Sequence, residues 1–168
     1  MFLYNEVQKR EANQERVRVG LIGAGKFGSM FLSQAPFTIG LEVRSIVDIS
    51  VENAKKNCRD VGWTEEQIES VLFFDNFKKM ISQTKIDVLV EATGDPVEGT
   101  KHALIAIEQG LDIVMVNVEA DVLSGPYLAK EAEKAGIVYS MAYGDQPALT
   151  TELVEWARAS GFHVVAAG

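Results

Sequence analysis

The sequence is poor in the residues that build disulfide frameworks and metal sites. Its 168 residues include one cysteine, Cys58, and two histidines, His102 and His163. A single cysteine excludes a disulfide within the chain. Neither histidine belongs to a spaced His or Cys cluster of the kind that binds zinc. We therefore expect no metal site, and we expect His102 to lie on a helix surface.

Excess positive charge and long apolar runs are also lacking. The formal net charge is -8, and the Lys and Arg residues are scattered along the chain. Such a surface repels nucleic-acid phosphates and anionic membranes. No apolar run approaches the length of a membrane span, and the N-terminus turns polar soon after Tyr4, unlike a signal peptide. We expect a cytoplasmic protein whose partners include neither nucleic acid nor membrane.

What the sequence does contain is a regular alternation of short apolar runs and helical stretches. A charged lead-in over residues 1–16, with a short helix, precedes it. Runs such as Ile113–Val116 are apolar on both faces, as strands of a parallel sheet covered by helices on each side must be. The predicted strands are Val17–Ile22, Glu42–Asp48, Val71–Phe74, Ile86–Glu91, Asp112–Asn117, Ile137–Ala142 and Phe162–Ala167. The expected fold class is α/β, a Rossmann-type doubly wound, mostly parallel sheet over residues 17–168.

Local signals predict where helices begin and end. Ser50 and Asp75 are expected helix N-caps, and Thr64 with Gln67 forms a capping-box pattern. Prolines near helix starts and glycines just past helix ends supply the remaining signals. These residues are Pro96, Pro126, Pro147, Gly110, Gly136 and Gly161.

A glycine-rich loop follows the first predicted strand and opens a helix. The first glycine allows a tight turn, the second lets the backbone approach a pyrophosphate, and the third lets the helix pack against the strand. The free N–H groups and the dipole of the helix start then attract phosphates. The loop residues, all expected to bind a dinucleotide, are Gly23, Ala24, Gly25, Lys26, Phe27 and Gly28.

An acidic residue stands where the adenosine ribose of a dinucleotide is expected. Asp48 ends the second predicted strand and lies 20 residues after Gly28, which is the spacing of about 20 residues expected for this acid. A carboxylate repels a 2′-phosphate and favours NAD, whereas Lys55 and Lys56 are close enough along the chain to swing back. The cofactor is therefore NADP or NAD, with a slight preference for NAD.

Polar residues at the ends of the later strands are candidates for the reactive end of the cofactor. Ala92, Thr93 and Gly94 are expected to pass under the ribose and diphosphate, and Asn117 to offer its amide to the nicotinamide ribose. Glu119, Asp145 and Gln146 are the catalytic candidates. Asp121 is also expected near the reacting centre. The alternative expectation for these residues is a helix cap, Asp121 or Ser124 before one helix and Asp145 or Gln146 before another.

Three segments together resemble the homoserine-dehydrogenase-like oxidoreductases. They are Val17–Phe31, Val114–Leu123 and Tyr139–Ala148. The last two look more narrowly like the branch named for the deoxyxylulose-phosphate-reductoisomerase-like enzyme, whose members often end in a SAF domain. The resemblance covers nearly the whole chain.

The resemblance implies an NAD(P)H-dependent oxidoreductase acting on a small polar carbonyl substrate. At least one activity of the narrower branch converts 1-deoxy-D-xylulose 5-phosphate to 2-C-methyl-D-erythritol 4-phosphate with NADPH. Homoserine dehydrogenases carry an Asn-Lys pair after the fifth strand, whereas Asn117 is followed here by Val118. Because this lysine is missing, homoserine is kept only as the alternative substrate. We expect the chain to be the cofactor half of an enzyme, without most of its substrate domain.

Two other functional classes fit part of the pattern. A regulatory domain that senses NAD(H) would use the same loop without catalysis. A methyltransferase also has a glycine loop and an acid after the second strand, but its sheet ends in an antiparallel hairpin, which the helical stretch 147–160 disfavours. The expected partners are a dinucleotide and a small-molecule substrate, with homo-oligomer formation left open.

Overall fold

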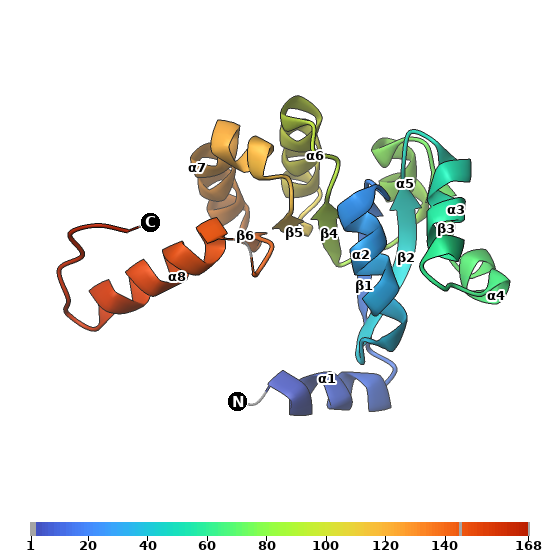
Figure 1. The fold of residues 1–168 in the computed structure, drawn as a ribbon, viewed down its shortest axis with the longest axis horizontal. Coiled ribbons are helices and arrows are strands. Elements are labelled where there is room, and N and C mark those ends of the chain that lie inside the picture. The colour runs from blue at the N-terminus through green and yellow to red at the C-terminus, as the bar shows by residue number, and fades with distance from the viewer. Residues whose placement is uncertain (1–2, 145, 168) are drawn as a thin grey trace.

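The computed structural model describes residues 3–144 and 146–167 and shows a sheet lined by helices (Figure 1). The strands are β1 (Val17–Ile22), β2 (Leu41–Val47), β3 (Leu72–Phe74), β4 (Val88–Glu91), β5 (Asp112–Met115) and β6 (Tyr139–Met141). The helices are α1 (Leu3–Ala12), α2 (Lys26–Gln34), α3 (Val51–Asp60), α4 (Glu65–Glu69), α5 (Phe77–Gln83), α6 (Pro96–Glu108), α7 (Val118–Ala135) and α8 (Gln146–Ala159), with a 3-10 turn η1 (Ala35–Phe37).

The six strands form one parallel sheet in the order β3-β2-β1-β4-β5-β6. The first six predicted strands are confirmed, with ends shifted by at most two residues. The predicted α/β fold class is confirmed as well. Strand order reverses between β1 and β4, because β1 pairs with β2 on one side and with β4 on the other.

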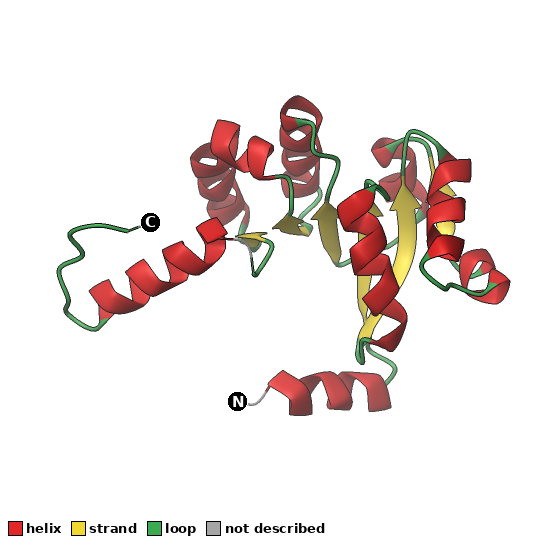
Figure 2. Ribbon diagram, in the orientation of Figure 1, coloured by secondary structure: helices red, strands yellow, loops and turns green. Residues whose placement is uncertain are grey.

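Helices flank the strands of the sheet (Figure 2), and apolar side chains from the two faces of the sheet form two separate cores. Helices α2 and α3 cover one face with Leu32 and Cys58, which pack with Leu21. On the other face, α5 and α6 contribute Met80 and Ala103. Each fully buried aliphatic side chain stabilises such a fold by about 1.5–3 kcal/mol, so this two-sided burial explains why the strands are apolar on both faces.

The seventh predicted strand is wrong. Residues 162–167 have no regular structure, and Phe162 and Val165 are exposed. Figure 1 shows α8 running away from the sheet, so the segment after it does not reach the β6 edge. An apolar run forms a strand only beside a neighbour that pairs with its backbone, and this run has none within reach.

Several helix boundaries follow the predicted capping signals. Ser50 caps α3 by accepting from the N–H of Asn53, and the Thr64 and Gln67 capping box is present at α4. Pro96 is at the start of α6, and Gly136 ends α7 in the left-handed conformation at φ 71°.

Two boundaries differ from the prediction. Asn76, not Asp75, caps α5, because the Asn76 side chain accepts from the N–H groups of Lys78 and Lys79, while Asp75 pairs with the Lys79 ammonium. Asn117 caps α7, so Pro126 is inside that helix instead of at its start, and neither Asp121 nor Ser124 is the cap. Asn117 lies two residues past the end of β5, so the helix starts as soon as the strand has ended.

None of the described helices is long and apolar enough to span a membrane.

The single cysteine gives a test of the packing of α3. Cys58 is fully buried, and burial raises the pKa of its thiol to about 11. At pH 8, about one such thiol in a thousand is ionised, since each pH unit below the pKa reduces the thiolate tenfold. We predict slow labelling by a disulfide reagent in native conditions and fast labelling in denaturant. Equal rates in both conditions would mean that α3 does not bury Cys58.

Candidate functional site

The carboxyl ends of β1, β2, β4 and β5 bring the predicted cofactor residues to one edge of the sheet. In open parallel sheets, ligands bind outside these ends, at the point where strand order reverses. That point lies here between β1 and β4. The glycine loop follows β1, Asp48 follows β2, and Ala92, Thr93 and Gly94 follow β4.

Gly23 makes the tight turn that leaves β1. Its φ is +91°, and its N–H donates to the Val47 carbonyl at 2.8 Å. A Cβ placed on Gly23 would lie 2.6 Å from the carbonyl oxygen of Ala92. The turn therefore packs against the end of β4 in a space that only glycine fits.

Gly28 brings α2 close to the turn, whereas Gly25 faces open space. A Cβ on Gly28 would lie 2.1 Å from the Gly23 carbonyl oxygen, but a Cβ on Gly25 would meet nothing within 4 Å. Gly25 is the N-cap of α2, and no side chain caps this helix start. The first N–H groups of α2 and its positive dipole end are therefore available to an anion.

Asp48 joins the end of β2 to the glycine loop. One carboxylate oxygen accepts from the Ala24 N–H at 2.9 Å, and the other accepts from the Ser50 N–H at 2.9 Å. A carboxylate has about four lone-pair sites, so both oxygens keep capacity for further donors. Ile49, the next residue, is 99% exposed.

Asn57 is a loop contact that the sequence analysis missed. Its side-chain N–H donates to the Ala24 carbonyl at 2.7 Å from α3, and the Ser29 hydroxyl donates to the same oxygen at 3.2 Å. Ala24 is fully buried, so its peptide is fixed on both sides. No sequence pattern marks Asn57, because its role depends on how α3 packs against the loop.

Glu91 is a buried acid that the sequence analysis also missed. It ends β4 with 0% exposure, and its carboxylate accepts from the Thr93 hydroxyl at 2.6 Å. His102 lies against it, with Nδ1 3.3 Å from the same carboxylate oxygen and its ring edge-on to Phe77. The expectation that His102 lies on a helix surface is therefore wrong. An acid at the end of an apolar strand run was the available signal.

Asn117 is buried at the start of α7. It is 2% exposed, its oxygen accepts from the Ala120 N–H at 3.1 Å, and its amide donates to the Asp95 carbonyl at 2.8 Å. The structure thus places it at the predicted edge with its side chain committed to the two loops. A direct contact with the nicotinamide ribose stays a prediction.

The remaining site candidates are at or near the first turns of helices. Lys26 and Phe27 are exposed at the start of α2, and Glu119 is exposed in the first turn of α7. Gln146 is the exposed first residue of α8, and Asp145 lies outside the described residues. Their catalytic roles stay predictions.

Asp121, in the first turn of α7, has a different role from Glu119 in the same turn. The Tyr139 hydroxyl donates to it at 2.8 Å, and burial together with this bond raises the pKa of Tyr139. Asp121 therefore ties α7 to β6.

Within residues 3–144 and 146–167, no group of three His, Cys, Asp or Glu side chains is arranged to hold a metal ion.

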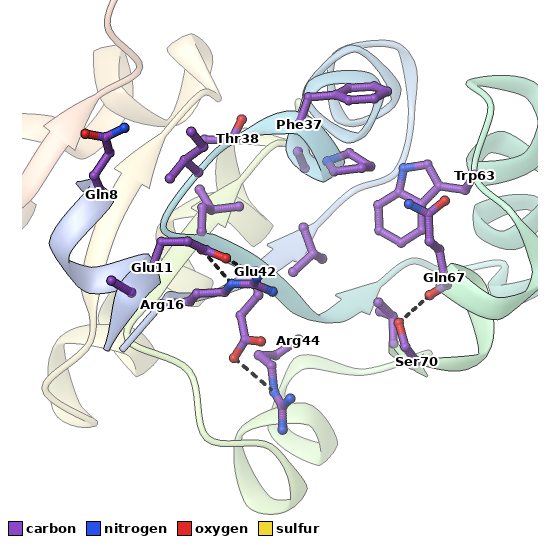
Figure 3. Close-up of a pocket in the computed structure, with 17 residues that line it drawn as sticks. Gln8, Glu11, Arg16, Phe37, Thr38, Glu42, Arg44, Trp63, Gln67 and Ser70 are labelled. Atoms are coloured by element: carbon purple, nitrogen blue, oxygen red, sulfur yellow. Dashed lines mark hydrogen bonds and ion pairs between the residues drawn. The ribbon is translucent and has the colours of Figure 1, made fainter. Parts of the chain in front are cut away.

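A cavity of about 730 Å³ lies elsewhere in the described part of the chain (Figure 3). It lies between α1, η1 and the start of β2, beside Trp63, so it is at the opposite end of β2 from Asp48. Its charged side chains are paired, Arg16 with Glu11 and Arg44 with Glu42. Pairing with Arg16 lowers the pKa of Glu11. Paired charges and distance from the glycine loop distinguish this cavity from the cofactor edge.

The glycine loop after β1, Asp48 after β2 and the parallel sheet define a dinucleotide-binding domain. A comparison of sequences assigns its family. The family model for the homoserine dehydrogenase NAD-binding domain matches residues 19–142. The chain belongs to this family, and the resemblance to homoserine-dehydrogenase-like oxidoreductases is confirmed at that level. No curated protein sequence matches the chain.

Several solved dehydrogenases share the fold. The WlbA dehydrogenase of Chromobacterium violaceum, solved with NADH and UDP-GlcNAcA, is 17% identical, with a TM-score of 0.62 over 86% of this chain and 40% of its own. A myo-inositol dehydrogenase of Corynebacterium glutamicum is 14% identical, with a TM-score of 0.62 over 86% of this chain and 41% of its own. GenD2 of gentamicin A biosynthesis, solved with NAD, is 16% identical, with a TM-score of 0.57 over 86% of this chain and 40% of its own. The chain thus spans about two fifths of their length.

Substitution at Gly28 tests the packing of the loop. We predict that Gly28→Ala lowers the free energy of unfolding by about 1–3 kcal/mol, the usual range for an overpacked site, because the added Cβ would meet the Gly23 carbonyl. Denaturant unfolding measures this change. The matched control is Gly25→Ala, whose Cβ meets no atom within 4 Å; a loss of stability as large in the control would contradict the assigned packing.

Proposed function

We propose that this chain is the cofactor domain of an NAD(P)-dependent dehydrogenase and that it binds the dinucleotide across the carboxyl ends of β2, β1 and β4. The observation that carries the proposal is the open space over Gly25 at the uncapped start of α2. The Asp48 carboxylate lies beside this space and accepts from the N–H of the neighbouring Ala24. The pyrophosphate fits this place because backbone N–H groups and the helix dipole favour an anion there.

The adenosine half fits the end of β2. Asp48 holds the loop through the Ala24 N–H and keeps lone pairs for ribose hydroxyls. The exposed Ile49 side chain offers an apolar surface to the adenine ring beside it.

The charges around Asp48 favour NAD over NADP. A 2′-phosphate would stand against the Asp48 carboxylate, and both nearby lysines are engaged along α3 instead. The Lys55 ammonium lies 3.9 Å from Glu52 and over the Phe73 ring, and the Lys56 ammonium lies 3.8 Å from Asp60. Neither ammonium neutralises charge at the ribose in this arrangement.

The proposed reaction is hydride transfer between the nicotinamide and a small polar carbonyl compound, with the reactivity supplied by the cofactor. Glu119, Asp145 and Gln146 remain the proposed polar groups near the reacting carbon. For the substrate we propose a sugar phosphate of the 1-deoxy-D-xylulose 5-phosphate type, with homoserine as the alternative. The motif resemblance of the segments after β5 and β6 supports this narrower assignment, and solved dehydrogenases of the same fold include one bound to a sugar nucleotide.

Gly25 gives the most direct test of the cofactor site. We predict that Gly25→Val weakens NADH binding at least about tenfold, which is about 1.4 kcal/mol, because the side chain occupies the pyrophosphate space. The fold should remain intact, since nothing lies within 4 Å of the added Cβ. Calorimetry gives the dissociation constant, and thermal unfolding verifies the fold.

Thr38→Trp is the control for Gly25→Val. Thr38 is exposed and lines the large cavity at the other end of β2. Filling that cavity should leave NADH affinity unchanged. Loss of binding in Thr38→Trp but not in Gly25→Val would move the cofactor site to the cavity and overturn the proposal.

Cofactor preference should change when the negative charge at Asp48 is removed and a positive charge is placed at the next residue. We predict that Asp48→Asn combined with Ile49→Arg shifts the ratio of NADP to NAD affinity toward NADP by about tenfold or more, through lost repulsion and a new guanidinium partner. Asparagine keeps an oxygen for the Ala24 N–H. Ile49→Arg alone is the control, and dissociation constants for both cofactors are measured for each variant. An unchanged ratio would mean that Asp48 does not face the ribose.

A sensing domain without catalysis is the second candidate, because the described residues that stand at the cofactor edge are mostly committed to holding its loops. Turnover separates the two. Oxidation of NADH by a protein carrying this domain, with a sugar phosphate or an aldehyde as acceptor, supports the dehydrogenase, whereas tight binding without turnover of any acceptor supports the sensor.

A further inference from the structure

Glu91 is a buried carboxyl group that none of the proposed cofactor contacts explains. Of the residues that the structure describes, it is the only carboxylate in the buried class, and one of its two oxygens has no hydrogen-bond partner. A buried charge is costly unless it is well paired, and an apolar residue of similar volume is often as stable or more stable in its place. Stability alone therefore does not account for a glutamate here.

The bonded oxygen of Glu91 fixes Thr93 in the turn between β4 and α6. The Thr93 hydroxyl donates to Glu91 at 2.6 Å, so its lone pairs remain for other donors. It accepts from the Asp95 N–H at 3.3 Å and from the Asn117 amide at 3.3 Å. All three hydrogen-bonding positions of this hydroxyl are thus used within the protein.

These bonds join the ends of two neighbouring strands. Asn117 follows β5, and its amide also donates to the Asp95 carbonyl in the turn after β4. Gly99 lets α6 approach the side chains of Asn117 and Glu91. A Cβ on Gly99 would lie 2.6 Å from the Asn117 amide nitrogen and 3.1 Å from the unpartnered Glu91 oxygen. The turn at residues 92–95 is therefore held by Glu91, through the Thr93 hydroxyl, and by Asn117, through the same hydroxyl and the Asp95 carbonyl.

In the proposed cofactor site, the turn at residues 92–95 would lie under the half of the dinucleotide that carries the nicotinamide. Each half of this fold receives one mononucleotide, and Asp48 marks the adenosine side at β2. β4 and β5 lie on the opposite side of β1, so the second mononucleotide crosses the turn at residues 92–95. Thr93 and Gly94 are both exposed there.

We propose that Glu91 is a positioning residue: by orienting Thr93 it presets the turn at residues 92–95 for the nicotinamide-bearing half of the dinucleotide. This inference rests on the proposed function, since it assigns a role within the same site. His102 also contacts this carboxylate, with Nδ1 3.3 Å from the same oxygen that accepts from Thr93.

Two ligands separate this role from general stability. ADP contacts only the glycine loop and the Asp48 side, whereas NADH also crosses the turn. We expect Thr93→Val, which has the same shape without the hydroxyl, to weaken NADH binding about tenfold, about 1.4 kcal/mol and near the worth of one hydrogen bond. ADP binding should stay within about twofold. Thr93→Ser keeps the hydroxyl and should behave as the unmodified chain toward both ligands.

Glu91→Met gives an independent arm of the test. It removes the carboxylate and leaves a side chain of similar volume, so the melting temperature should be unchanged or higher. NADH affinity should still fall, and ADP affinity should not. A structural residue would lower the melting temperature and weaken both ligands together.

Each outcome decides one claim. If the unmodified 168-residue chain binds neither ADP nor NADH, the proposed function fails. If it binds both, and Thr93→Val either changes nothing or weakens both ligands equally, the positioning role fails while the cofactor site stands. Should Glu91→Met not fold, the Thr93→Val and Thr93→Ser pair still decides the matter, because Thr93 is exposed.

Discussion

The buried peptide of Ala24 is the contact on which the cofactor edge depends. Its N–H is bound by the Asp48 carboxylate from β2, and its carbonyl is bound by Asn57 from α3 and by Ser29 from α2. Three elements thus converge on one residue between two glycines. Gly25, the next residue, has no atoms packed over it. The loop nevertheless keeps its conformation, because the Ala24 peptide is held by hydrogen bonds one residue earlier.

The sequence predicted the elements with local causes and failed on those with distant ones. Apolar runs fixed β1 to β6 within two residues, and Ser50 and Thr64 capped the helices as expected. The run 162–167 has the composition of a strand, but a strand needs a free edge beside it, and α8 carries that segment away from the sheet. Pairing partners are a property of the whole fold, so composition alone gave the wrong result.

The site was predictable to a similar degree. The spacing of the glycines and Asp48 follows from one strand–loop–helix unit and its neighbour, so the sequence shows it. Asn57 and His102 act through contacts made by the packing of α3 and α6, which no short stretch of sequence shows, whereas Glu91 stands visibly as an acid at the end of an apolar strand run. Polar groups at this edge also serve the fold, as Asn117 does by capping α7, so a polar residue at this edge is not for that reason alone a binding residue.

The central place of β1 in the sheet has a consequence for biosynthesis. β1 leaves the ribosome well before its partner on one side, β4, which begins only at Val88. During that interval β1 and β2 can pair while the other edge of β1 exposes unsatisfied N–H and C=O groups, and such open edges invite pairing with other chains. The nascent protein is therefore most exposed to pairing with other chains in the interval between the synthesis of β2 and that of β4.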